Sequence, residues 1–239
     1  LDAAKPQTGA SIHPEDNHPM TEDRDYEMSQ EEKLKDHVLE HSPGGLDGAL
    51  KVFNAFDHAN GLGMALGPQK GDIIGSIVQS LLGASGFDGP VHVLELGSHM
   101  GDGTMRIMHS MAPRAGSVYS LDSSPHEHSL GAQMVRHALR TEPTHEMQYH
   151  PMVMPHDLGS FLDTLKDHHD VPHFHVVMMD HGDHSTFGQD LQKLIASKML
   201  APGAKIISDN ALTKKKAKHD FFNLVKSHGL KSETFDVSK

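Results

Sequence analysis

From residue 91 onward the chain alternates short apolar runs with amphipathic segments, and this alternation restricts the fold more than any other feature. Four runs have the length of buried strands: VHVLEL, SVYSLD, FHVVMMD and AKIISD. Helices are expected after them, at about 103–111, 125–139, 187–200 and 216–228. Strands that alternate with helices favour a parallel sheet that is covered on both faces. We therefore expect an α/β fold, a Rossmann-like, doubly wound, mostly parallel sheet.

The part of the chain before residue 91 predicts extra N-terminal helices and a tail. Ser29 precedes the helical segment QEEKLKDHVLEH and has Glu32 three residues later, the pattern of a capping box. Two further helices are expected in LDGALKVFNAFDHA and GDIIGSIVQSLLGA. Residues 1–28 are proline-containing, polar and acidic without apolar periodicity, which is typical of an extended or disordered tail. Residues 29–239 are expected to form a single domain.

Composition narrows the classes of function. The formal net charge of −11 argues against nucleic-acid binding as the main task. No apolar run reaches the roughly 18 residues that a membrane span requires, so we expect a soluble protein without a span. The chain has no cysteine, which excludes disulfides and thiolate metal sites but leaves the compartment unknown. Because residue 1 is leucine, the chain as given is either processed, for instance as an organellar protein, or a fragment.

The turn after VHVLEL carries glycine at positions 97, 101 and 103. In doubly wound sheets, ligands bind beyond the carboxyl ends of the strands. Glycine permits positive φ and close backbone approach, while the next helix begins with free N–H groups. The spacing differs from the G-x-G-x-x-G of dinucleotide sites, and tight packing of strand against helix is the alternative explanation.

Two acidic residues accompany this turn. Glu95 lies just before it, and Asp122 ends the next strand, where an acidic residue would accept hydrogen bonds from ribose hydroxyls. The turn has no basic residue before Arg106 to compensate a pyrophosphate. A nucleoside with a cationic sulfonium group therefore fits these surroundings better.

Five motifs carry a specific resemblance: MALGPQKG, VLELGSHMG, SLDSSP, MMDH and SDNA. Their order and spacing, from about Glu31 to Asp236, resemble the catechol O-methyltransferase family. The resemblance implies a class I methyltransferase fold and an S-adenosylmethionine site. In that site Met64 and Leu66 cover the cofactor, and Asp122 holds its ribose. Further residues are implied around its other parts: Glu95, Gly97 and His99 at the amino acid end, Gly101 and Gly103 in the turn, and His156 and His181 near the adenine and the sulfonium region.

Polar residues follow the two later strands as the pairs Asp180–His181 and Asp209–Asn210, so they should converge on one rim of the sheet. Two carboxylates and an amide oxygen prefer Mg²⁺ or Ca²⁺ to zinc. Capping of strand ends is the alternative for such residues. The resemblance implies that Asp180, Asp209 and Asn210 are Mg²⁺ ligands. The 22 histidines are dispersed and contain no H-E-x-x-H motif that would indicate zinc.

The sequence departs from the family in two places. In the motif DHGDH, Asp183 occupies the position of the family's catalytic lysine, and Gly182 replaces an aromatic residue of the substrate pocket. Asp183 and His184 are therefore the candidate catalytic bases. In this acidic rim, the alternatives for Asp183 are a further metal ligand or a charge that repels a phenolate. Family members also continue past SETFDVSK into a final strand, and a sheet without it leaves an edge for the N-terminal tail or a protein partner to cover.

Two functions stay open. The first is an S-adenosylmethionine-dependent O-methyltransferase that acts, with Mg²⁺, on a hydroxyl of an aromatic, catechol-like small molecule. The second is a methyltransferase fold that has lost catalysis and serves as an accessory subunit of a larger complex, for instance in an organelle. The glycine turn and its acidic residues favour the first. The missing lysine, the missing aromatic residue and the short C-terminal part favour the second.

Overall fold

The structure, a computed structural model, describes residues 28–63, 65–84, 88–140, 146–154, 157–168, 171, 173–211 and 215–237. Residues 1–27 of the predicted tail lie outside the described residues. The same holds for Met64 and His156, two residues expected near the cofactor.

A five-stranded sheet forms the centre of the described part, with all neighbouring strands parallel. The strands are β1 (Val91–Leu96), β2 (Gly116–Asp122), β3 (Met147–Val153), β4 (Phe174–Met179) and β5 (Leu200–Ser208), in the spatial order β3-β2-β1-β4-β5. The chain winds from central β1 outward to β3, then returns to β4 and continues to the other edge. The winding therefore reverses between β1 and β4, as the predicted doubly wound fold requires.

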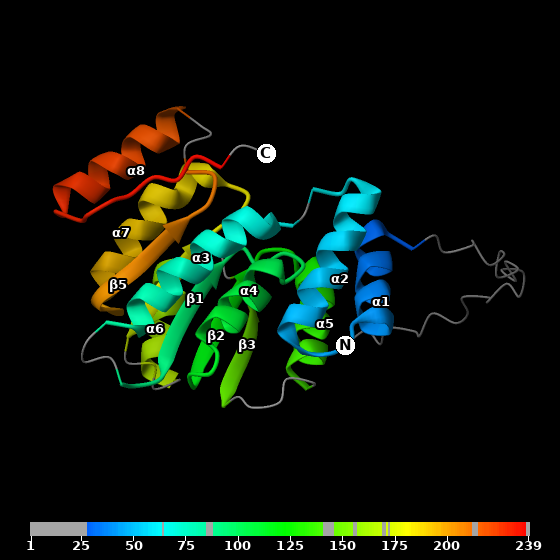
Figure 1. Cartoon of the computed structure of the whole chain (residues 1–239). Coiled ribbons are helices and arrows are strands. Elements are labelled where there is room, and N and C mark those ends of the chain that lie inside the picture. The colour runs from blue at the N-terminus through cyan, green and yellow to red at the C-terminus, as the bar shows by residue number, and fades with distance from the viewer. Residues whose placement is uncertain are drawn as a thin grey trace, which may run out of the picture.

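Helices cover both faces of this sheet (Figure 1). One buried cluster joins one face of β1 and β2 to α1 (Gln30–His41), α2 (Gly45–Asn60), α3 (Gly67–Leu82), α4 (Asp102–Met111) and α5 (Pro125–Arg140). The other cluster joins the opposite face to α6 (Leu158–His168), α7 (Phe187–Ser197) and α8 (Lys215–Ser227). Successive side chains of β1 point to opposite faces of the sheet, so Val93 belongs to the first cluster and Leu94 to the second. The α/β fold class is confirmed, together with the extra N-terminal helices.

The capping box predicted at Ser29 is present and starts α1. The Glu32 N–H donates to Ser29 Oγ at 3.1 Å, and the Ser29 N–H donates to Glu32 Oε2 at 2.8 Å. Leu34 and Val38 then form the buried side of this helix. The local sequence therefore fixes both where α1 begins and which face it buries.

One strand and one α-helix were not predicted, and three boundaries were wrong. α3 begins at Gly67, four residues before the predicted segment GDIIGSIVQSLLGA, and β5 begins at Leu200, four residues before the predicted AKIISD. The sequence reading missed β3 and α6. β3 is an edge strand of mixed polarity that contains Pro151, which an edge tolerates because one side of the strand needs no N–H donor. The helix expected at 187–200 ends at Ser197, because Lys198 adopts φ +59° and Leu200 already belongs to β5.

Two further features concern the surface. Within the described residues β5 pairs only with β4, so its other side carries no ladder hydrogen bonds. No helix among them is both long enough and apolar enough to cross a membrane.

Candidate functional site

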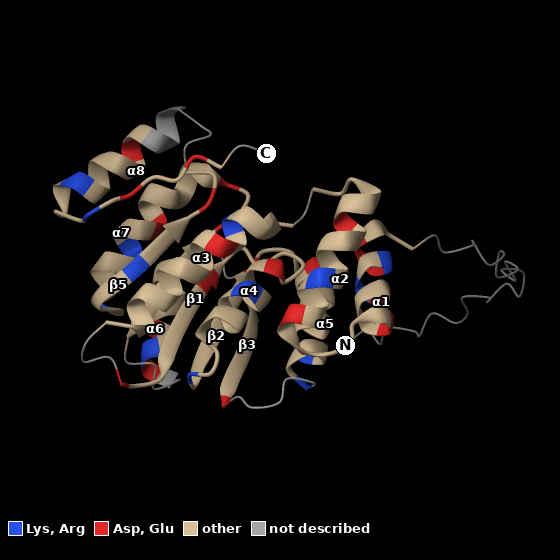
Figure 2. Cartoon of the chain, in the orientation of Figure 1, with Lys and Arg blue, Asp and Glu red and all other residues tan. Residues whose placement is uncertain are grey.

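The carboxyl ends of β1, β2, β4 and β5 meet at one rim of the sheet (Figure 1). Backbone hydrogen bonds continue past the strand ends, from Gly97 N to Leu121 O at 2.8 Å and from Asp180 N to Leu96 O at 2.8 Å. Asp209 N bonds to Met179 O at 3.0 Å in the same way. Figure 2 shows acidic segments at this rim. The glycine turn, Asp122, Asp180 and Asp209 are therefore brought together, as the strand order predicts.

The three glycines of the turn are each required by contacts inside the chain. Gly97 has φ +91°, and a Cβ on it would lie 2.5 Å from the backbone of His181. Gly101 has φ +83°, and its Cβ would lie 2.9 Å from Val135 of α5. A Cβ on Gly103 would lie 2.6 Å from the carboxylate of Glu95. Tight packing, the alternative explanation, therefore accounts for the glycine pattern without a ligand.

Asp122 is held firmly at the end of β2. Its Oδ2 accepts the His99 N–H at 2.6 Å, and its Oδ1 accepts the Ser124 N–H at 2.8 Å. The residue is 8% exposed. Each carboxylate oxygen retains a further lone pair, so Asp122 is oriented by the backbone and can still accept hydroxyl donors from the rim.

Glu95 lies inside the domain beneath α4. Its Oε2 accepts hydrogen bonds from the hydroxyls of Thr104 and, at 2.8 Å, Ser120. Burial raises the pKa of Glu95 to about 7, although both hydrogen bonds oppose the shift. The carboxyl therefore connects β1, β2 and α4 below the turn.

A second buried group, not predicted from the sequence, ties the turn to the N-terminal helices. Asp102 accepts the Leu66 N–H at 2.8 Å and Arg106 Nε at 3.1 Å, and Arg106 Nη2 donates to Asn54 of α2 at 2.9 Å. Burial raises the pKa of Asp102, and Arg106 opposes this shift. The loop that carries Leu66, a predicted cofactor-covering residue, is thereby fixed to the start of α4. The i,i+4 spacing of Asp102 and Arg106 was the signal in the sequence.

Ser98 and His128 form another buried pair that sequence reasoning missed. Ser98 Oγ lies 2.7 Å from His128 Nδ1, which joins the turn to α5. Burial lowers the pKa of His128, and the charge of Asp122 opposes this shift.

The predicted metal residues meet at the ends of β4 and β5. Burial and the neighbouring Asp209 raise the pKa of Asp180 to about 8, while Lys70 opposes the shift. Asp209 Oδ2 lies 2.6 Å from Lys70 Nζ and accepts a hydrogen bond from Asn210 Nδ2 at 3.0 Å. Within the described ranges no three His, Asp or Glu side chains gather into a group that could hold a metal ion. Two crowded carboxyls and an amide nevertheless suit Mg²⁺, which takes one or two carboxylates and completes its shell with water or substrate oxygens.

The predicted catalytic residues lie on the α7 side of the rim. Asp183 is exposed and accepts the Ser185 N–H at 3.0 Å, which caps the short helix η1 (His184–Thr186). The ring of His184 packs against Phe187. His181 Nε2 lies 3.1 Å from the Asp190 carboxylate, and its ring also packs on Phe187. A Cβ added at Gly182 would meet no atom within 4 Å, so the backbone there is not closely packed.

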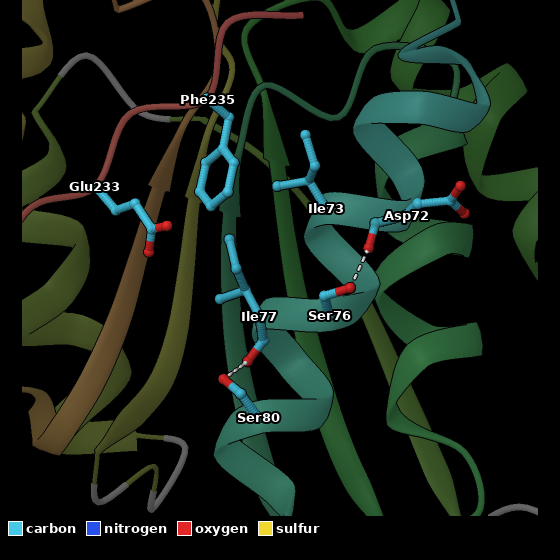
Figure 3. A pocket seen from close by; sticks show the side chains of 7 residues that line it. All are labelled: Asp72, Ile73, Ser76, Ile77, Ser80, Glu233 and Phe235. Carbon is cyan, nitrogen blue, oxygen red and sulfur yellow. Dashed lines mark hydrogen bonds between the residues drawn. The ribbon is translucent and has the colours of Figure 1, made fainter.

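A groove elsewhere contains none of these residues. A cavity of about 350 Å³ lies between α3 and the C-terminal segment, with Ile73 and Ile77 on one side and Glu233 and Phe235 on the other (Figure 3). The predicted chemistry is therefore at the rim and not in this groove.

Comparison with known proteins identifies the fold. No family model matches the chain, and no curated protein matches it. Among solved structures, the O-methyltransferase from Bacillus cereus in complex with SAH has a TM-score of 0.53 at 15% identity, over 82% of this chain and 79% of that one. Cofactor-bound Rv0187 from MTB has a TM-score of 0.51 at 17% identity, over 84% and 78%. TomG of Streptomyces achromogenes, an O-methyltransferase of tomaymycin synthesis in complex with SAM, has 0.50 at 15% identity, over 69% and 70%. The chain therefore has the Rossmann-like fold of these proteins.

Proposed function

We propose that this protein binds S-adenosylmethionine at the rim and transfers its methyl group to a hydroxyl of an aromatic, catechol-like small molecule with the help of Mg²⁺. The observation that carries the proposal is Asp122, which the His99 and Ser124 N–H groups orient at the end of β2 beside the turn. This is where a carboxylate would hold ribose hydroxyls. Solved structures of the same fold contain SAM or SAH, which supports this cofactor.

In this proposal each group at the rim has one task. Asp122 orients the ribose, and the turn with Gly97, His99 and Gly101 borders the amino acid end. Leu66 is held over the rim by its bond to Asp102. Asp180, Asp209 and Asn210 would hold Mg²⁺, which when bound lowers the pKa of a coordinated hydroxyl and positions it.

The proton acceptor is the least conventional part of the proposal. Asp183 already accepts a hydrogen bond from the Ser185 N–H, so we assign the base role to His184 first and to Asp183 second. Either residue must accept the hydroxyl proton before or during methyl transfer, because the family's lysine is absent.

A second candidate function is a structural or accessory subunit without catalysis. The packing of the three glycines favours it, because those contacts would preserve the motif even without a cofactor. The side of β5 that pairs with none of the described strands would then bind a protein partner by adding a strand.

Calorimetric titration of S-adenosylmethionine, with and without Mg²⁺, followed by a methyl-transfer assay on catechol, separates the two functions. We expect micromolar binding with turnover. Binding without turnover would favour the second candidate function, an accessory subunit that retains the cofactor site. Absence of binding under both conditions would refute the cofactor site.

Asp122→Ala is expected to weaken S-adenosylmethionine binding by about 1.5–3 kcal/mol, or roughly 10–150-fold, because hydrogen bonds to a charged group are lost. The measurement is the same calorimetric titration. Asp47→Ala removes an exposed carboxylate of α2 and should leave the affinity unchanged. Unchanged affinity in folded Asp122→Ala would remove the ribose role of this residue.

A further inference from the structure

We propose that Lys70 is a built-in counter-cation of the candidate metal site, and that its ammonium group competes with Mg²⁺ for Asp209 and so sets the affinity for the ion. This inference rests on the proposed function, because the metal ligands are those assigned above.

The pairing is close and sheltered from solvent. Lys70 Nζ lies 2.6 Å from Asp209 Oδ2, and the two side chains are only 20% and 16% exposed. The pair Lys51–Asp47 on α2 has the same 2.6 Å separation, but its side chains are 73% and 59% exposed. Water and salt screen a partly buried pair less than an exposed one. The ammonium group of Lys70 therefore strongly repels any other cation that approaches Asp209.

The ammonium group occupies an atom that the ion would use. Asp209 Oδ2 accepts both Lys70 Nζ at 2.6 Å and Asn210 Nδ2 at 3.0 Å, which fills the two lone pairs of that oxygen. The amide of Asn210 would also have to turn, since its carbonyl oxygen is the predicted ligand. Mg²⁺ can bind Oδ2 only when these donors withdraw, so the ion and Lys70 exclude each other there.

The scaffold holds Lys70 in this position. The residue belongs to the first turns of α3, which packs against α4 and β5. A Cβ on the next residue, Gly71, would lie 2.3 Å from Arg106 Nη1, so α3 approaches the guanidinium closely at this point. Arg106 in turn is bound to Asp102. One residue after Lys70, α3 therefore packs against the same buried group that holds the turn.

Calorimetric titration of Mg²⁺ into the full chain tests this inference. The titration is made at about pH 9 to limit competition by protons for the two carboxyl groups. We expect Lys70→Met to bind Mg²⁺ at least about tenfold more tightly than the unchanged protein, because a repelling charge is removed. Lys70→Arg keeps the charge and should stay near the unchanged affinity. Lys51→Met makes the same change in net charge at an exposed pair and should have no effect.

The outcomes separate this inference from the proposed function. If Lys70→Met binds Mg²⁺ no more tightly than the unchanged protein does, Lys70 does not compete with the ion, and the metal site still stands. If Asp209→Asn abolishes the tight binding of Lys70→Met, the ion is located at the proposed site. If neither protein binds Mg²⁺ while S-adenosylmethionine still binds, the metal site and the role of Lys70 fail together but the cofactor site stands.

Discussion

Replacing Asp102 with alanine is expected to lower the free energy of unfolding by about 3–5 kcal/mol, the usual loss when one partner of a buried ion pair is removed. Asp102 is 5% exposed and Arg106 is 9% exposed. The variant leaves the guanidinium buried with Asn54 and leaves the Leu66 N–H without its carboxylate acceptor. Chemical denaturation, followed by circular dichroism, measures the change.

Two variants control this experiment. Asp47→Ala breaks the exposed i,i+4 pair with Lys51 and should cost no more than about 0.5 kcal/mol. Asp102→Leu combined with Arg106→Met removes both charges and should lose less stability than Asp102→Ala alone. A loss below about 1 kcal/mol for Asp102→Ala would show that the pair does not hold the turn and the N-terminal helices together.

The fold could be predicted largely because the inner strands are buried on both faces. β2 is buried at every position, and β1 at all but His92, so both read as continuous apolar runs. β3 lies at the edge with mostly half-buried residues, and its sequence MQYHPMV shows neither a continuous run nor a strict alternation. An edge strand tolerates proline because one of its sides is unpaired. An edge strand is also less buried, so its sequence lacks the apolar pattern from which a strand is predicted.

The site could be predicted only where it depends on strand ends. Asp122, Asp180 and Asp209 follow strands directly, so the parallel sheet alone brings them to one rim. Lys70 meets Asp209 across 139 residues of sequence, and Asn54 meets Arg106 across 52. Those contacts depend on how α2 and α3 pack over the sheet, which no local pattern reveals. The sequence therefore predicts that Asp122, Asp180 and Asp209 lie at one rim, but it does not predict that Lys70 pairs with Asp209.

Glu95→Gln is expected to remove about 3 kcal/mol of pH dependence from the stability of the domain. Burial raises the pKa of Glu95 to about 7 from an ordinary value of 4.5. Between these two pH values the folded state keeps a proton that the unfolded state has lost, so stability falls as pH rises through this window. A shift of about 2.5 pKa units corresponds to about 3 kcal/mol, which is fully lost only above pH 7. Glutamine cannot ionise, so this loss is absent in the variant.

The measurement is urea unfolding of both proteins from about pH 4 to pH 8, and the decisive quantity is the difference between them. Burial lowers the pKa values of His92, His128 and His175, and these groups are common to both proteins and cancel. Burial, Asp209 and, to a smaller extent, the charge of Glu95 raise the pKa of Asp180, so the variant also lowers the pKa of Asp180 and this carboxyl adds a smaller contribution of its own to the difference. The amide beside Thr104 and Ser120 also changes the free energy of unfolding by an amount that does not depend on pH. This amount does not affect the result, because only the variation of the difference with pH is used. Glu40→Gln, which removes an exposed carboxyl, should give a difference that varies by less than about 0.5 kcal/mol. A difference for Glu95→Gln that is equally flat would mean that this carboxyl is ionised inside the domain at no cost. Burial beneath α4 with only two hydroxyl donors makes that outcome physically unfavourable.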